Sequence, residues 1–167
     1  MAWKASVLVV ANVTADSDEL VQALRERAEQ EPTQFTLLVP ATGPLATSRE
    51  AAKRQLEAAL GRLREAGLEV EGRIGDQDPL CAVQDAWDPT AFDEIVVSTL
   101  PTHASKWLLV DLPHRIERLT GVHVTHVVAA EKKEAPVTVP APEQETYGVL
   151  APLAPLWQGA PPERRRS

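Results

Sequence analysis

The sequence of 167 residues has little cysteine, no long apolar run and no excess of basic residues. Cys81 is the sole cysteine, so no disulfide can form within the chain and nothing indicates an oxidising compartment. No stretch approaches the roughly 20 apolar residues that a membrane span needs. The net charge of −7 argues against nucleic-acid binding, because phosphate contacts need a basic face. The apolar residues 5–11 are too short for a signal core and no convincing cleavage site follows, so we expect a cytoplasmic protein.

Strand and helix patterns alternate along the chain as far as about residue 130. Residues 6–11 are a continuous, largely β-branched run, which is typical of a strand buried on both faces of a parallel sheet. Further strands are predicted at 35–39, 68–74, 93–98 and 122–128. Helices are predicted between them, the first three starting at Asp16, at Ser48 and at Asp78-Pro79. Helical spacing also covers about 106–119, where Pro113 could either kink one helix or start a new one. This order predicts parallel βαβ units with right-handed crossovers, in a three-layer α/β/α sandwich.

The periodic pattern stops after Ala130, and half of the 14 prolines fall in the last 37 residues. We therefore predict a domain at 1–130 and an extended or partly disordered proline-rich tail at 131–167. One strip of the tail has an apolar load that a solvated linker rarely carries, and its candidate partner-binding residues are Tyr147, Leu150, Leu153, Leu156 and Trp157. The strip could pack on its own domain, cross to a second subunit, or bind another protein.

Two segments of the domain are distinctive, namely Gly75-x-x-Asp78-Pro79 and the run Phe92-Asp93-Glu94-Ile95-Val96-Val97. With them the domain resembles the universal stress protein family. The resemblance covers about residues 5–130 and implies a five-stranded parallel sheet of order 3-2-1-4-5, of the Rossmann-like type found in adenine nucleotide alpha hydrolases. It also implies a homodimer that pairs through the last strand, which would otherwise be an exposed edge.

In an open parallel sheet, ligands bind beyond the carboxyl ends of the strands at the point where strand order reverses. The resemblance places Asn12 and Thr14 at positions that touch the nucleotide in the family, and the backbone near Val39 beside its adenine. Together with the loops that should border the crevice, this gives six candidate cofactor-binding residues: Asn12, Thr14, Val39, Gly75, Ser98 and Thr99.

The triphosphate end of the family's site is altered in this sequence. Family members that bind ATP hold its phosphates with glycines after the fourth strand and with a Gly-Ser pair that opens the last helix. Here Leu100 and Pro101 occupy the loop, and the pair aligns with Val110-Asp111. Glycine lets backbone N–H groups approach phosphate oxygens, whereas proline has no N–H. We expect the Asp111 carboxylate to cap the following helix and to repel phosphate.

Other chemistry-bearing residues have simpler explanations. Ser98, His103 and Asp111 could form a nucleophile, base and orienter, but no Gly-x-Ser-x-Gly elbow is present. His123 and His126 lie three residues apart on a strand, so they point to opposite faces and cannot bind one metal ion. We expect Cys81 to be a buried helix residue.

Trp107 fits the helical spacing of Leu112 and Ile116, which favours packing on the sheet with Lys106 in solvent. Trp107 could alternatively anchor a partner.

The sequence favours a non-catalytic regulatory or interaction module of the stress-response type, with a degenerate triphosphate site and no cofactor beyond a weakly bound adenine nucleotide. One alternative is an adenine-nucleotide sensor that binds phosphate through Ser98, Thr99, Thr102 and Lys106. The other is a nucleotide-hydrolysing enzyme, for which no metal set or convergent acid–base pair is evident.

Overall fold

The computed structural model describes residues 3–43, 45–101 and 105–131 of the chain. The strands are β1 (Ala5–Val10), β2 (Thr33–Pro40), β3 (Glu69–Gly75), β4 (Glu94–Thr99) and β5 (Val124–Val128). The helices are α1 (Asp18–Gln30), α2 (Leu45–Glu65), α3 (Pro79–Ala86), α4 (Lys106–Leu109) and α5 (Leu112–Thr120). Within these ranges no helix has the length and apolar character needed to cross a bilayer.

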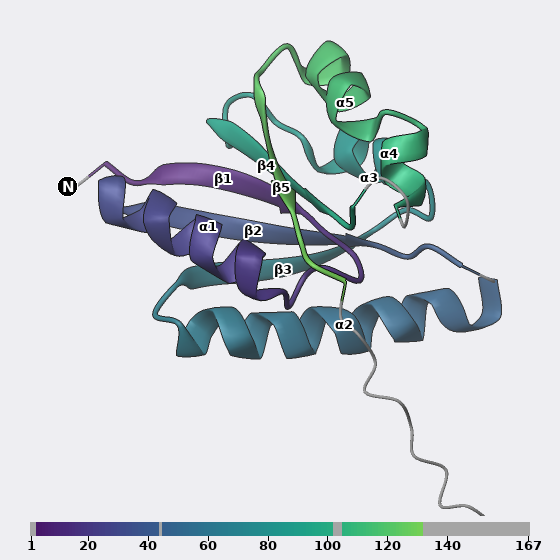
Figure 1. Cartoon of the computed structure of the whole chain (residues 1–167). Helices are drawn as coiled ribbons and strands as arrows, with labels where there is room; N and C mark the ends of the chain where they lie inside the picture. Colours follow the sequence, from purple (N-terminus) through teal and green to yellow (C-terminus); the bar gives the residue numbers. More distant parts are fainter. Residues whose placement is uncertain (1–2, 44, 102–104, 132–167) are drawn as a thin grey trace, which may run out of the picture. The chain divides into compact units, whose positions relative to one another are not determined.

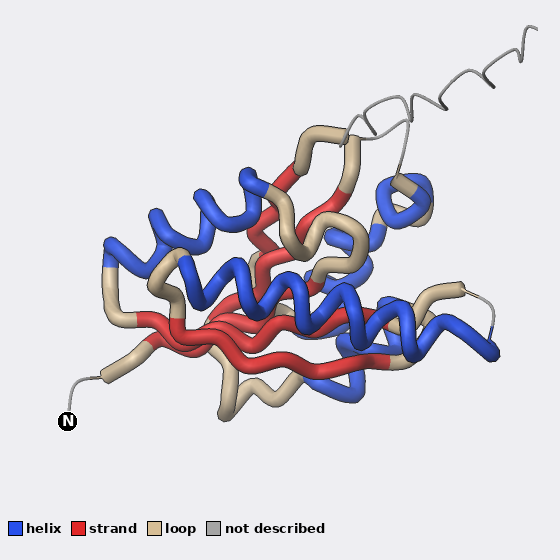
Figure 2. Tube along the Cα trace, turned by 90° about the horizontal axis from the view of Figure 1, so that it is seen from below, coloured by secondary structure: helices blue, strands red, loops and turns tan. Residues whose placement is uncertain are grey.

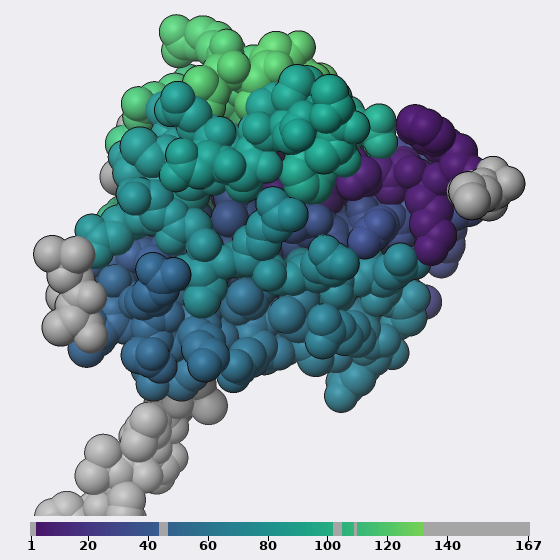
Figure 3. Space-filling model, turned by 180° about the vertical axis from the view of Figure 1, so that it is seen from behind, coloured from purple at the N-terminus to yellow at the C-terminus, as the bar shows by residue number. Residues whose placement is uncertain are grey.

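The strands form one parallel sheet of order β3-β2-β1-β4-β5, as predicted. Helices α1 and α2 cover one face, and α3, α4 and α5 lie on the other (Figures 1 and 2). In the view of Figure 3, teal and green segments from the second half of the chain cover much of the early strands. The fold is therefore a three-layer α/β/α sandwich, with β3 and β5 at the edges of the sheet.

Strand β1 is the centre of both hydrophobic cores. Its residues from Val7 to Val10 have no exposed surface. Val7 and Val9 belong to the core formed with α1 and α2, and Leu8 and Val10 belong to the core formed with α3 and α5. This two-sided burial is the reason that residues 6–11 form an unbroken apolar run rather than an alternating one.

Two of the predicted helix starts are wrong, and the third is correct. The N-cap of α1 is Ser17 rather than Asp16, and its hydroxyl accepts a hydrogen bond of 3.2 Å from the Leu20 amide. Helix α2 starts at Leu45, so Ser48 lies inside the helix instead of capping it. At α3 the Asp78 carboxylate accepts from the second and third amides of the helix, as its cap-then-proline order predicts.

The helical spacing over 106–119, which fits one kinked helix or two, belongs to two helices on either side of Asp111. This residue has a left-handed backbone with φ of 53°, and Pro113 occupies the first turn of α5. The Asp111 carboxylate makes no capping hydrogen bond, and its Oδ1 lies 2.7 Å from Nδ1 of His114. The prediction that this carboxylate satisfies the helix amides is therefore wrong, because the left-handed turn directs it to a side chain of α5.

Two glycines give a matched test of the packing between β3 and α3. At Gly75 an added Cβ would lie 2.5 Å from Cβ of Ala82, and at Gly61, on the exposed side of α2, it would meet nothing within 4 Å. We expect Gly75→Ala to lower the free energy of unfolding by about 1–3 kcal/mol through overpacking. Gly61→Ala should raise it by about 0.5–1 kcal/mol, because alanine favours the helix. Urea unfolding measures the free energy of unfolding of both variants. A change of the same sign and size in Gly75→Ala and Gly61→Ala would contradict this description of the interface.

Candidate functional site

A cavity of about 400 Å³ opens where β1 and β4 end. From β1 the chain continues to β2 on one side, whereas β4 pairs with β1 on the other side and is followed by β5 still farther out. The loops after β1 and β4 therefore leave the sheet in opposite directions at this point. The cavity volume lies within the range of about 300–1,000 Å³ that is usual for small-molecule sites. Its described lining residues are Asn12, Val13, Thr14, Thr42, Gly43, Ser98, Thr99, Leu100, Ser105, Lys106 and Trp107.

The lining combines an apolar wall with a few polar groups. Val13, Leu100 and Trp107 supply the large apolar side chains, and Lys106 is the single charged side chain among the described lining residues. A mostly apolar surface with a few placed polar groups is typical of sites that bind a small organic molecule. Because the described lining includes no carboxylate, such a molecule would be neutral or anionic.

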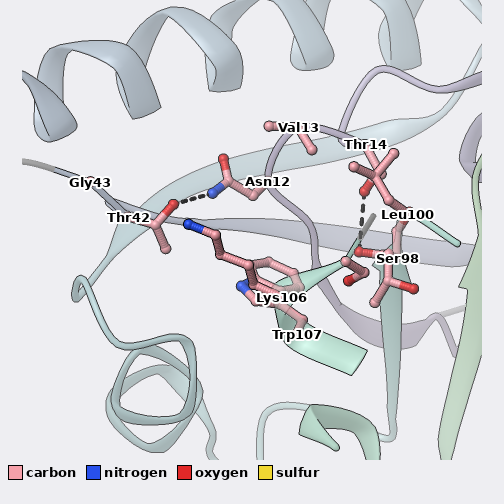
Figure 4. A pocket seen from close by; sticks show the side chains of 11 residues that line it. Asn12, Val13, Thr14, Thr42, Gly43, Ser98, Leu100, Lys106 and Trp107 are labelled. Atoms are coloured by element: carbon pink, nitrogen blue, oxygen red, sulfur yellow. Dashed lines mark hydrogen bonds between the residues drawn. The ribbon is translucent and has the colours of Figure 1, made fainter. Parts of the chain in front are cut away.

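One end of the cavity is formed by the loops after β1 and β2. The Asn12 side-chain amide donates a hydrogen bond to the Thr42 hydroxyl, which ties these two loops together. Figure 4 shows the Lys106 ammonium turned toward this pair. Lys106 makes no ion pair with any described residue, so its charge is available to a ligand.

The other end is formed by hydroxyl side chains at the ends of β1 and β4. Thr14 donates from Oγ1 to the carbonyl oxygen of Ser98 across 3.1 Å (Figure 4). Ser98 is only 1% exposed, and its hydroxyl has no hydrogen-bond partner among the described residues. Leaving a buried hydroxyl unsatisfied costs roughly 1–3 kcal/mol. A ligand with a polar group at this end would remove that cost.

Thr99 connects the cavity with the edge strand β5. Its Oγ1 lies 2.7 Å from Nε2 of His126, and Thr99 itself is almost fully buried. Burial lowers the pKa of His126 from its ordinary value, because the charged ring would lose hydration. Which of these two atoms donates the hydrogen bond depends on the tautomer of the ring.

Four of the six candidate binding residues line the cavity, namely Asn12, Thr14, Ser98 and Thr99. The remaining two lie nearby but outside the lining. Val39 is fully buried in the core formed with α1 and α2, and Gly75 pairs with Pro40 and packs against α3.

As the helical spacing predicts, Lys106 is exposed and Trp107 packs against the core formed with α3 and α5, and both residues also line the cavity. Ser105, just before them, lines it as well. The signal that could have identified all three is their position directly after the loop that follows β4.

The other chemistry-bearing residues have partners of their own. Nδ1 of His123 lies 2.9 Å from the Glu117 carboxylate, away from the Thr99–His126 contact. His103 and the tail residues 132–167 lie outside the described residues, and Asp111 pairs with His114.

Cys81 is exposed, so the expectation of a buried thiol is wrong. The pKa of its thiol is raised, first by loss of hydration and then by Asp78, Asp76 and Asp85, which disfavours a reactive thiolate.

No protein-family model matches the sequence, and no curated protein does, but solved structures share its fold. A universal stress protein from Archaeoglobus fulgidus in complex with dAMP has 15% identity and a TM-score of 0.57, over 76% of this chain and 99% of that one. One in complex with cAMP has 20% identity and a TM-score of 0.56, over 77% and 99%. One from Arabidopsis thaliana with AMP bound has 16% identity and a TM-score of 0.53, over 75% and 92%. The chain has the universal stress protein fold. The strand order that the family resemblance implies is the order observed in this sheet.

We predict that two histidines of this fold titrate on opposite sides of 6.5, their ordinary pKa. The hydrogen bond that the His114 ring donates to the Asp111 carboxylate raises the pKa of His114, whereas burial lowers the pKa of His126. The contact between His114 and Asp111 therefore contributes its full stabilisation below pH 6.5. This contribution is lost as the pH rises through the pKa that His114 has in the folded state. Burial of His126 instead costs stability as pH falls below 6.5. NMR titration of the ring carbons, assigned with His114→Gln and His126→Gln, checks the order, and a higher midpoint for His126 would contradict it.

Proposed function

We propose that this chain is a non-catalytic regulatory module that binds a small adenine nucleotide in the cavity between β1 and β4. The observation that carries the proposal is the cavity itself, which lies at the switch point of the sheet and is lined by polar loops around an apolar wall. Proteins of the same fold were solved with dAMP, cAMP and AMP. The apolar wall suits a purine, and the hydroxyl and amide side chains suit a ribose and a phosphate.

The loop after β4 supports a nucleotide with few phosphates rather than ATP. Leu100 lines the cavity where the ATP-binding pattern would need glycine, and Pro101 has no N–H to donate. Lys106 supplies one positive charge, and the described lining supplies no second cation. A triphosphate would bring more negative charge than these groups can neutralise.

A non-catalytic role is supported by the chemistry of the lining. The described residues place no carboxylate in the cavity, and Thr99 with His126 is the one hydroxyl–imidazole contact beside it. Nucleophilic catalysis usually needs a third group that orients the base.

A regulatory module must also transmit its state. The homodimer through β5 and a protein partner for the tail strip 147–157 stay predictions of the same proposal.

The first test is calorimetric titration of the full chain with AMP, ADP and ATP. We expect AMP to bind at least as tightly as ATP, with no release of phosphate over hours. A ligand at 100 times its dissociation constant should stabilise the fold by about 2.7 kcal/mol, so thermal unfolding gives a second readout. Affinity that rises with phosphate number would contradict the degenerate triphosphate site, and steady phosphate release would contradict the non-catalytic role.

Trp107 should contribute to binding if a purine occupies the apolar wall. Stacking of a base on an aromatic ring is worth about 1–3 kcal/mol. We expect Trp107→Ala to weaken AMP binding at least roughly fivefold, and Trp107→Phe to retain most of the affinity. Unchanged AMP affinity in Trp107→Ala, with its thermal unfolding like that of the parent, would place the base elsewhere.

A further inference from the structure

The two ends of the cavity differ in charge, and this difference sets the orientation of a ligand. The Lys106 end carries a positive charge beside the Asn12–Thr42 pair, whereas the Ser98 end carries neutral hydroxyl groups (Figure 4). We infer that the Lys106 end binds a single phosphoryl group, and that the Ser98 hydroxyl bonds the opposite, uncharged end of the ligand. This inference rests on the proposed function and names the ligand as a nucleoside that carries one phosphoryl group.

The Lys106 end has the properties of an anion subsite. The ammonium lies within the lining of a cavity, has no ion-pair partner among the described residues, and faces no carboxylate of the described lining. Thr42 accepts the Asn12 amide proton and keeps its own hydroxyl proton for another acceptor. An ammonium beside a hydroxyl donor suits a phosphate oxygen better than any neutral group, because hydrogen bonds between charged partners are the stronger ones.

The Ser98 end gives independent evidence that a ligand belongs in the cavity. The Ser98 carbonyl already accepts from Thr14, yet the hydroxyl of the same residue is buried without a described partner. Buried polar groups in folded proteins are nearly always hydrogen-bonded, so the unpaired hydroxyl of this lining residue is a group that a bound ligand would satisfy. A base edge or a ribose hydroxyl has donors and acceptors that can supply the hydrogen-bond partner that the Ser98 hydroxyl lacks.

The same lining limits the ligand to one phosphoryl group. Lys106 is the one charged side chain of the described lining, and Trp107 beside it offers no charge. A second or third phosphate would therefore find no charged partner in the described part of the site. Within that part, one lysine sets the number of phosphates that we expect to bind.

Four variants of the full chain test the inference by calorimetry with adenosine, AMP and ribose 5-phosphate. We expect Lys106→Gln to lower AMP affinity at least roughly tenfold and to leave adenosine affinity unchanged, because only the charged contact is lost. Ser98→Ala should lower the affinities for adenosine and for AMP by the same factor, roughly two- to tenfold. Lys53→Gln, on the exposed face of α2, is the matched control and should change neither. Lys106→Arg should retain most of the AMP affinity.

The outcomes separate this inference from the proposed function. If AMP binds the parent chain and Lys106→Gln equally well, the phosphoryl group lies elsewhere and the inference is overturned, while the nucleotide-binding proposal survives. Suppose instead that Lys106→Gln weakens the binding of ribose 5-phosphate, and that AMP binds the parent chain no more tightly than ribose 5-phosphate does. The phosphoryl subsite is then supported, and the proposal that the site binds adenine fails. If none of the three compounds binds at millimolar concentration, both fail. Thermal unfolding of each variant shows whether it is folded.

Discussion

The placement of β1 between β2 and β4 is the constraint on which the rest of the structure depends. Every side chain from Val7 to Val10 is removed from water, two into each core. Fully burying such a side chain contributes about 1.5–3 kcal/mol, so β1 stabilises both helical layers at once. The parallel pairing to β2 and to β4 then forces their carboxyl ends to one edge of the sheet. The cavity is the space that these diverging ends leave.

The polar contacts at that edge follow from the same arrangement. Asn12 and Thr14 leave β1 in the same loop, and they bind in different directions, to Thr42 after β2 and to the Ser98 carbonyl at the end of β4. The loop after β1 is therefore held on both sides of the switch point. A site built in this way is positioned before any ligand arrives, which lowers the ordering cost of binding.

The strands could be predicted from the sequence because burial on two faces leaves an unbroken apolar run, as in residues 6–11. The helix starts could not all be predicted, because Asp16 and Ser17 are both good caps and only the backbone conformation decides between them. Trp107 packs against the core and Lys106 is exposed, as the helical spacing predicted, but their place in the cavity lining was not predicted. The left-handed turn at Asp111 separates α4 from α5, so spacing counted back from Ile116 does not show which residues of α4 line the cavity. A residue with φ of 53° that is not glycine leaves no periodic signal in a sequence.

The position of one lysine shows how an acidic protein could bind the anionic ligand proposed above. The net charge of −7 repels anions at a distance, but at 0.1 M salt exposed charges more than about 10 Å apart are largely screened. Lys106 is the one charged side chain of the described lining, and its exposure to solvent weakens its attraction for a phosphate. If a nucleotide binds as proposed, each further phosphate adds negative charge and finds no second cation in the described lining. In that proposal charge, rather than the volume of the cavity, decides which nucleotide the site prefers.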